Sequence, residues 1–364
     1  SRAATDSPVA ILAQGFSSSC RFEPGATPPG RRRMPNLAAT GDIYTVQERV
    51  ERPILHLFPI SLNSQKGHFF MRISTVWENT DVQIVNFPEE NQGLDYARMC
   101  PNMTVPALEI DDRMICDSLE IQKYLATHYP GPGDIYAKGK QEPFIVMMRE
   151  WDEGLFTYRR MGKMGRYANE LRLLRLHQAL LGAMEDGEEN DKLLDGSTVL
   201  DKYIWKIASI HHLTETTSGE ITPELQRRID GNDELLKKIL ATATDLLERS
   251  SGTLLFSDAL CSADGFLAAI LFRCEGTDNG MFAGLMTEFP RVAEFWDEFK
   301  ERDESDVITP YTMFWAKKNA ARSGQVFKVL GLATGMLRVP ALPEEIQERV
   351  DAKLTEISEN YVKQ

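Results

Sequence analysis

Short apolar runs alternate with polar, helix-periodic stretches where the folded region begins. The predicted elements are, in order, a buried strand at 54–58, a helix at 65–77, a strand at 82–85 and a polar helix around 91–98. Asn63 or Ser64 is the expected cap of the first helical turn, because short polar side chains accept hydrogen bonds from unpaired N–H groups there. The chain must then cross to its next strand.

A hairpin and a capped helix are predicted next. The expected elements are strands at 102–110 and 113–116, the turn Asp111-Asp112 between them, and a helix at 117–125. Pro106 lies near the start of the first strand, where its missing N–H is tolerated and a cis bond is common. Asp117, followed three residues later by Glu120, has the pattern of a capping box.

Helical periodicity dominates from residue 142 onward. The expected helices span 143–160, 169–184, 200–213, 223–249, 263–273, 291–302 and 343–362. Between the first of these helices and the apolar helix at 263–273, residues around 185–250 form a long helical insertion where a short connection would suffice. The pattern therefore predicts an α/β half followed by an all-α half.

Charge and composition exclude some classes of function. Acidic residues outnumber Lys and Arg by 54 to 41, a net charge of −13, which argues against a general nucleic-acid binder. The five cysteines are scattered without a C-x-x-C pair, so a reducing compartment is expected. His211 and His212 point about 100° apart on a helix with no third ligand in view, so we expect no metal.

The first residues have a different composition. Residues 1–39 are rich in Ser, Ala, Gly, Pro and Arg, contain only Asp6 and Glu23 as acids, and should not fold alone. This composition resembles part of an organellar targeting region, so we expect a mitochondrial or chloroplast protein; the alternative is a cytoplasmic protein with residues added for expression. We expect this arm to run over another surface, anchored by Ile11, Leu12, Phe16 and Arg31-Arg32-Arg33.

The succession of Val105-Pro106, hairpin and Asp117-Ser118 resembles the pattern of glutathione transferases. That resemblance implies a thioredoxin-like α/β N-terminal domain followed by an all-α C-terminal domain, the glutathione transferase fold, here with a long helical insertion. The implied division is an extended arm at 1–50, a thioredoxin-like glutathione-binding domain at 51–132, an all-helical domain at 142–303 with its insertion around 185–250, and a C-terminal extension at 304–364.

The resemblance also implies a binding site for glutathione. The ligand would pair its backbone with Val105 beside Pro106, place its ammonium near Asp117, and place its γ-glutamyl carboxylate near Ser118 at a helix N-terminus. The alternative is that Pro106 only shapes a turn and that Asp117 and Ser118 only cap a helix.

A serine stabilises the glutathione thiolate in theta- and zeta-like transferases. It follows the first strand, as Ser61 does here, so the resemblance makes Ser61 the catalytic candidate. Ser64 is the competing candidate and is included among the binding residues. No cysteine occupies this loop, which excludes omega-like thiol chemistry.

Two further features bear on the subfamily. Residues 260–271 resemble the buried core helix of the transferases, with Cys261 where a Ser or Thr cap is expected. The insertion and the run Ser64-Gln65-Lys66 resemble the branch of ganglioside-induced differentiation-associated proteins, whose members are mitochondrial and doubtful as transferases. His68 replaces an arginine of that branch.

Two functions follow from these features. The first is a glutathione-binding protein that conjugates glutathione to an electrophile; the second is a non-catalytic accessory or scaffold subunit of an organellar membrane complex, holding protein partners through its arm and C-terminal extension. Residues 329–337 are apolar with a Gly-x-x-x-Gly face but fall short of the roughly 20 residues that span a bilayer, so peripheral membrane contact is expected at most.

Overall fold

The computed structural model describes residues 39–40, 43–45, 50–131, 136, 139–308, 328 and 331–362, with short gaps at 162, 219–220, 251, 257–258 and 278–279. All of them belong to one unit, Asn36–Gln364. Most of the predicted arm, including its anchor residues, lies outside the described residues. Two short strands nevertheless form at Ala39–Thr40 and Ile43–Thr45, within the stretch assigned to the arm.

In the described part of the chain, six strands form one mixed sheet in the order β1-β2-β6-β5-β3-β4. The strands are β1 (Ala39–Thr40), β2 (Ile43–Thr45), β3 (Ile54–Leu57), β4 (Asp81–Ile84), β5 (Ala107–Ile110) and β6 (Arg113–Ile115). Strand β3 is central and pairs parallel with β4 and antiparallel with β5. Its Leu55 and Leu57 on one face and His56 on the other are all buried, as expected of a strand covered on both faces.

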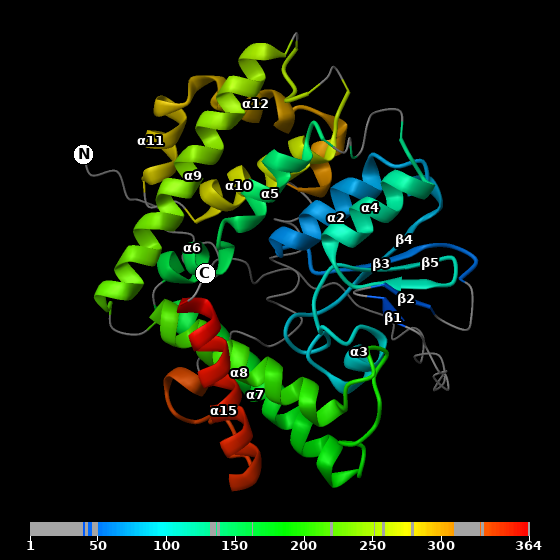
Figure 1. Cartoon of the computed structure of the whole chain (residues 1–364), viewed down its shortest axis with the longest axis vertical. Coiled ribbons are helices and arrows are strands. Elements are labelled where there is room, and N and C mark those ends of the chain that lie inside the picture. The colour runs from blue at the N-terminus through cyan, green and yellow to red at the C-terminus, as the bar shows by residue number, and fades with distance from the viewer. Residues whose placement is uncertain are drawn as a thin grey trace, which may run out of the picture. The chain divides into compact units, whose positions relative to one another are not determined.

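Helices cover both faces of this sheet (Figure 1). Helices α2 (Leu62–Arg72) and α4 (Ser118–His128) pack together on one face, and α3 (Leu94–Met99) lies on the other. The cap of α2 is Ser61, so the prediction of Asn63 or Ser64 was wrong. Helix α2 also ends earlier than predicted, and a short 3-10 turn, η1 (Trp77–Asn79), leads into β4.

The helical half follows the predicted order, except that the single helix predicted at 143–160 is divided into two helices and that the helix at Met281–Glu288 was not predicted. Its helices are α5 (Glu142–Glu150), α6 (Glu153–Met161), α7 (Lys163–Glu185), α8 (Val199–Ser218), α9 (Pro223–Arg249), α10 (Ser262–Gly276), α11 (Met281–Glu288), α12 (Pro290–Lys300) and α15 (Glu344–Val362), with the 3-10 turn η2 (Asp303–Val307). Helix α10 is apolar on nearly all sides and is buried, packing against α2. No helix in the described residues is both long and apolar enough to cross a membrane.

The core helix α10 begins with a capping box at Cys261, the position where a Ser or Thr cap was expected. Cys261 is the cap residue, and the Asp264 carboxylate accepts hydrogen bonds from the N–H groups of Cys261 (2.8 Å) and Leu255 (2.9 Å). The two chain segments that meet at the start of α10 are therefore fixed by one buried side chain.

The insertion and the C-terminal extension pack on each other. Helix α8 contacts α7 on one side and α15 on the other, and their apolar side chains form a core separate from that around α10. Ala97 and Met103 of the α/β half belong to this second core. The extension thus covers the chain's own insertion.

Candidate functional site

The two candidate serines at the start of α2 have different surroundings. Ser61 is partly exposed, and its Oγ accepts the N–H of Ser64 at 3.4 Å. Ser64 is fully buried, and its Oγ accepts the N–H of Phe58 at 3.2 Å. The Ser64 hydroxyl thus holds the loop between β3 and α2, whereas the Ser61 hydroxyl is the more accessible to a ligand.

The bond between Val105 and Pro106 is cis, in the loop that leads into β5. Pro106 packs against α2 so closely that a Cβ on Gly67 would lie 2.6 Å from the proline Cγ. This glycine therefore allows the loop to approach the helix that Ser61 caps. In the described part of the chain, the backbone N–H and C=O of Val105 form no hydrogen bond, so both groups keep their hydrogen-bonding capacity.

Asp117 is the N-cap of α4. Its Oδ1 accepts the N–H groups of Leu119 (2.8 Å) and Glu120 (3.2 Å). The Glu120 side chain pairs with Lys123 at 2.8 Å, so the predicted capping box is present in one direction. Both bonds go to Oδ1, and among the described residues Oδ2 accepts no hydrogen bond. Ser118 is the first residue of the helix and is 9% exposed.

A buried lysine that was not among the predicted site residues lies beside these groups. Lys66 is 4% exposed, and its Nζ lies 4.4 Å from the centre of the Phe266 ring on α10 and 3.4 Å from Asn63 Oδ1. Burial lowers the pKa of Lys66 to about 8, while the negative charges of Glu153 and Asp117 act in the opposite direction. Helical spacing could have predicted the burial of Lys66, because this lysine shares a face of α2 with Phe69 and Phe70.

The helical half holds the loop before Ser61. Arg273 on α10 donates to the carbonyl of Ile60 and pairs with Glu153 on α6 at 3.2 Å. Both side chains are largely buried, so this pair is shielded from solvent. The catalytic candidate is therefore positioned by residues from both halves.

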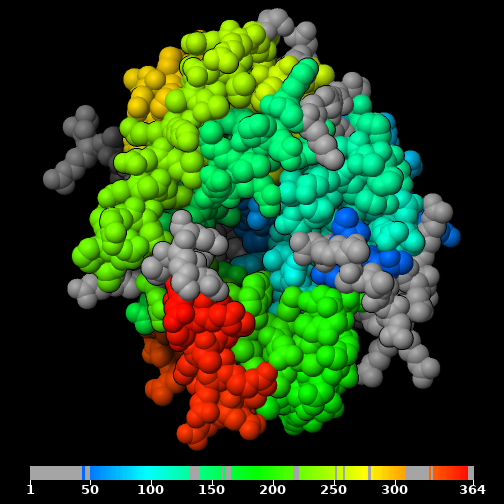
Figure 2. Space-filling model, in the orientation of Figure 1, coloured from blue at the N-terminus to red at the C-terminus, as the bar shows by residue number. Residues whose placement is uncertain are grey.

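The structure joins the predicted residues through α2. Ser61 caps this helix, Pro106 packs on its Gly67, and Asp117 acts electrostatically on its Lys66. In the space-filling view, a hollow shows atoms of the N-terminal half at its floor and is bordered by atoms of the helical half (Figure 2). A small ligand held in such a hollow would contact both halves.

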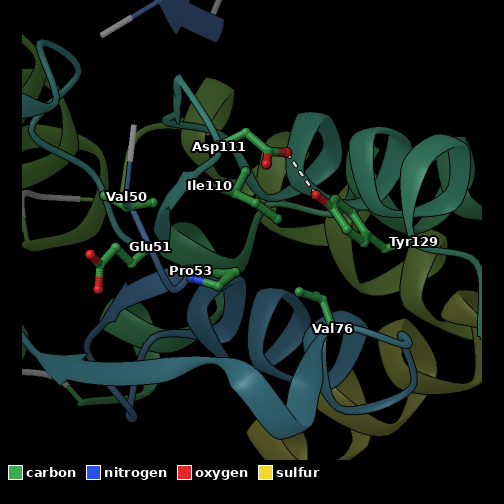
Figure 3. A pocket seen from close by; sticks show the side chains of 7 residues that line it. All are labelled: Val50, Glu51, Pro53, Val76, Ile110, Asp111 and Tyr129. Carbon is green, nitrogen blue, oxygen red and sulfur yellow. Dashed lines mark hydrogen bonds between the residues drawn. The ribbon is translucent and has the colours of Figure 1, made fainter. Parts of the chain in front are cut away.

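A cavity of about 520 Å³ lies at the opposite end of β3 and β5. The side chains of Val50, Glu51, Pro53, Val76, Ile110, Asp111 and Tyr129 line it (Figure 3). Asp111 accepts the hydroxyl of Tyr129 at 2.7 Å and that of Tyr124 at 3.2 Å. None of the predicted ligand residues lines this cavity.

One family comparison covers the α/β half. Residues 55–133 match the family model for the glutathione S-transferase N-terminal domain. The matched segment contains Ser61, Ser64, Val105-Pro106 and Asp117-Ser118, so every predicted site residue lies within this N-terminal domain. The described structure has the thioredoxin-like sheet and the all-α half that the sequence predicted.

Solved structures similar to this chain are distant in sequence. Glutathione transferase F7 from Populus trichocarpa is 16% identical, with a TM-score of 0.40 over 72% of this chain and 98% of that chain. An epsilon-class glutathione S-transferase from the housefly, Musca domestica, is 14% identical, with a TM-score of 0.42 over 75% and 98%. BmGSTD1 from Bombyx mori is 16% identical, with a TM-score of 0.41 over 76% and 99%. No curated protein matches the sequence.

Proposed function

We propose that this chain binds glutathione where α2, α4 and the cis-proline loop meet. The observation that carries the proposal is the Val105-Pro106 loop, whose Val105 backbone has no recorded hydrogen bond among the described residues. A peptide ligand pairs its own backbone with such groups. The match of residues 55–133 to a glutathione S-transferase N-terminal domain supports glutathione as that peptide.

The charged ends of glutathione have matching groups on α4. Asp117 Oδ2 would pair with the ligand's ammonium, and Ser118, at the positive end of the helix dipole, would bind its γ-glutamyl carboxylate. Calorimetric titration with glutathione tests this assignment. Asp117→Asn keeps a cap acceptor but removes the charge, so it should weaken binding while the helix stays formed.

Asp112→Asn is the matched control, because Asp112 is exposed in the turn between β5 and β6 at the far end of the strands. This variant should bind as the unaltered protein does. Absence of heat with millimolar glutathione, in a chain that circular dichroism shows to be folded, would reject the proposal.

A conjugation reaction would use Ser61. Its hydroxyl would donate a hydrogen bond to the glutathione thiolate, which then attacks an electrophilic carbon and expels a leaving group such as chloride. A charge-assisted hydrogen bond of about 1.5–3 kcal/mol corresponds to a roughly 10–100-fold loss of kcat/KM in Ser61→Ala. Chloronitrobenzene is a suitable chromogenic electrophile. An unchanged rate in Ser61→Ala would remove the residue from this role.

The second candidate function is that of a non-catalytic accessory or scaffold subunit in an organellar membrane complex. The packing of α15 on α8 favours this second function. Helices α7, α8 and α15 form a layer with a core separate from that around α10, and this layer is additional surface for protein partners. Fluorescent tagging would test the mitochondrial or chloroplast location, and affinity purification with and without α15 would test partner binding. A cytosolic, unaccompanied chain would contradict it.

A further inference from the structure

Two cysteines that the proposed function does not use meet beneath the cis-proline loop. Cys100 ends α3 and Cys116 directly follows β6, and they are 0% and 1% exposed. Their side chains are hydrogen-bonded to each other and belong to the same apolar cluster as Val105. Elements separated in sequence thus bring two thiols into contact.

Polar groups surround the Cys100 sulfur. It donates to the carbonyl of Thr104 at 3.7 Å, and the Thr104 hydroxyl in turn donates to the carbonyl of Cys116 at 3.2 Å. The amine of Lys206 on α8 approaches from the helical half and donates to the carbonyl of Asn102 at 2.9 Å. The thiol pair therefore lies in a polar enclosure rather than in a purely apolar core.

This enclosure favours the thiolate of Cys100. Burial acts to raise its pKa, but hydrogen bonds with Cys116 and Thr104 and the charged form of Lys206, whose own pKa burial lowers to about 7, lower the pKa below the ordinary value. Burial and the negative charge of Asp264 instead raise the pKa of Cys261 well above the ordinary value. Because the thiolate is the reactive form, Cys100 is a better nucleophile than Cys261.

We propose that Cys100 and Cys116 form a reversible disulfide when hydrogen peroxide oxidises the protein. The Cys100 thiolate attacks one peroxide oxygen, the O–O bond breaks and hydroxide leaves, so that sulfur becomes a sulfenic acid. The Cys116 sulfur then attacks this sulfenic sulfur, its proton joins the departing hydroxide, and water is released. In total, two thiols and one hydrogen peroxide give one disulfide and two waters.

The linked sulfurs would close a ring that contains Val105 and Pro106. Oxidation would also remove the S–H donor that Cys100 offers to Thr104, directly before Val105. The modification therefore lies within the loop that leads into β5. The proposal does not depend on glutathione binding, because the linkage is measured directly.

Peptide mapping of the full chain tests the proposal. Trypsin cleaves after Arg98, Arg113 and Lys123, which places the two cysteines on separate peptides, 99–113 and 114–123. The protein is treated with hydrogen peroxide, denatured with N-ethylmaleimide to block free thiols, digested and analysed by mass spectrometry. We expect peptides 99–113 and 114–123 to appear disulfide-linked, and dithiothreitol to restore both as free thiols.

Variants sharpen the result. Cys100→Ser and Cys116→Ser should each abolish the linked peptide, whereas Cys274→Ala on α10 should retain it. Two maleimide-labelled peptides after peroxide treatment would overturn the proposal. Linkage of either peptide to a different cysteine, or a sulfinic acid on Cys100 without linkage, would also overturn it. The unaltered chain decides these outcomes even where a variant fails to fold.

Discussion

The buried ammonium of Lys66 should destabilise the fold at neutral pH. In an unfolded chain the pKa of this lysine is the ordinary 10.5, and in the folded protein burial lowers it to about 8. Since each pKa unit corresponds to 1.36 kcal/mol, the charged form is penalised by about 3 kcal/mol below pH 8. This free-energy penalty is of the same order as the stability lost in a strongly destabilising point mutation.

The sign of the pH dependence follows from proton counting. Between pH 8 and 10.5 the unfolded chain binds more protons at this site than the folded one, so stability rises with pH through that window. Replacing the amine with the similarly shaped Met removes the penalty but also removes the contact of Nζ with the Phe266 ring, about 1 kcal/mol. Lys66→Met should therefore unfold at higher urea concentration at pH 7, with an advantage of roughly 2 kcal/mol.

Urea unfolding followed by tryptophan fluorescence at pH 7 and at pH 9.5 measures this difference. The variant's advantage should shrink by about 2 kcal/mol between the two pH values, because the wild-type amine is then largely neutral in the folded state. Lys123→Met is the control, since Lys123 is an exposed lysine paired with Glu120 and its variant should show no comparable change. A pH-independent difference for Lys66→Met would refute the assigned burial of the charge.

Three further substitutions test the packing around the site. Gly67→Ala should lower the free energy of unfolding, measured with urea, by about 1–2 kcal/mol, because the added methyl group clashes with Pro106. Gly231→Ala is the control: the space around its Cβ position is open, so this change should raise the free energy of unfolding by up to about 1 kcal/mol. Equal effects of the two substitutions would contradict the close approach of Pro106 to Gly67. Ser64→Ala should lower the same free energy by about 1–3 kcal/mol, because it leaves a backbone N–H after β3 without its acceptor; an unchanged stability would free Ser64 for a ligand role. Asp264→Ala removes the acceptor of two buried N–H groups, so it should lower the free energy of unfolding by about 3 kcal/mol or more. Its thermal midpoint should therefore fall further than that of Gly67→Ala or Ser64→Ala. A midpoint shift smaller than that of Ser64→Ala would contradict this role of Asp264.

Periodicity located most elements because their burial is uniform. The central strand at 54–57 and helix α9 are found where the sequence predicted them, since an apolar run and a long amphipathic stretch each permit one interpretation. Local chemistry set the boundaries that were missed. Helix α2 begins at Leu62 because Ser61, rather than a later polar residue, accepts the first-turn N–H, and two neighbouring serines give no basis for choosing from sequence alone.

The site was predictable where it rests on local motifs. The cis bond before Pro106 and the cap at Asp117 each involve residues within a few positions of one another. Lys66 and Arg273 were not predicted, because their roles arise from contacts between the two halves. Lys66 faces a ring on α10, and Arg273 donates to a carbonyl 213 residues away in the sequence. No single-sequence pattern encodes such a pairing.

The insertion also belongs to the framework of this site. Two lysines of α8 hold one residue of the loop before Val105: Lys206 donates to the carbonyl of Asn102 at 2.9 Å, and Lys202 donates to its Oδ1 at 3.2 Å. Lys206 is buried at 6% exposure, so this contact is protected from competing water. Since α15 packs on the same helix, the C-terminal extension supports the helix that holds the loop. The inserted helices and the proposed glutathione loop therefore form one continuous structure, in which residues outside the N-terminal domain hold the loop in place.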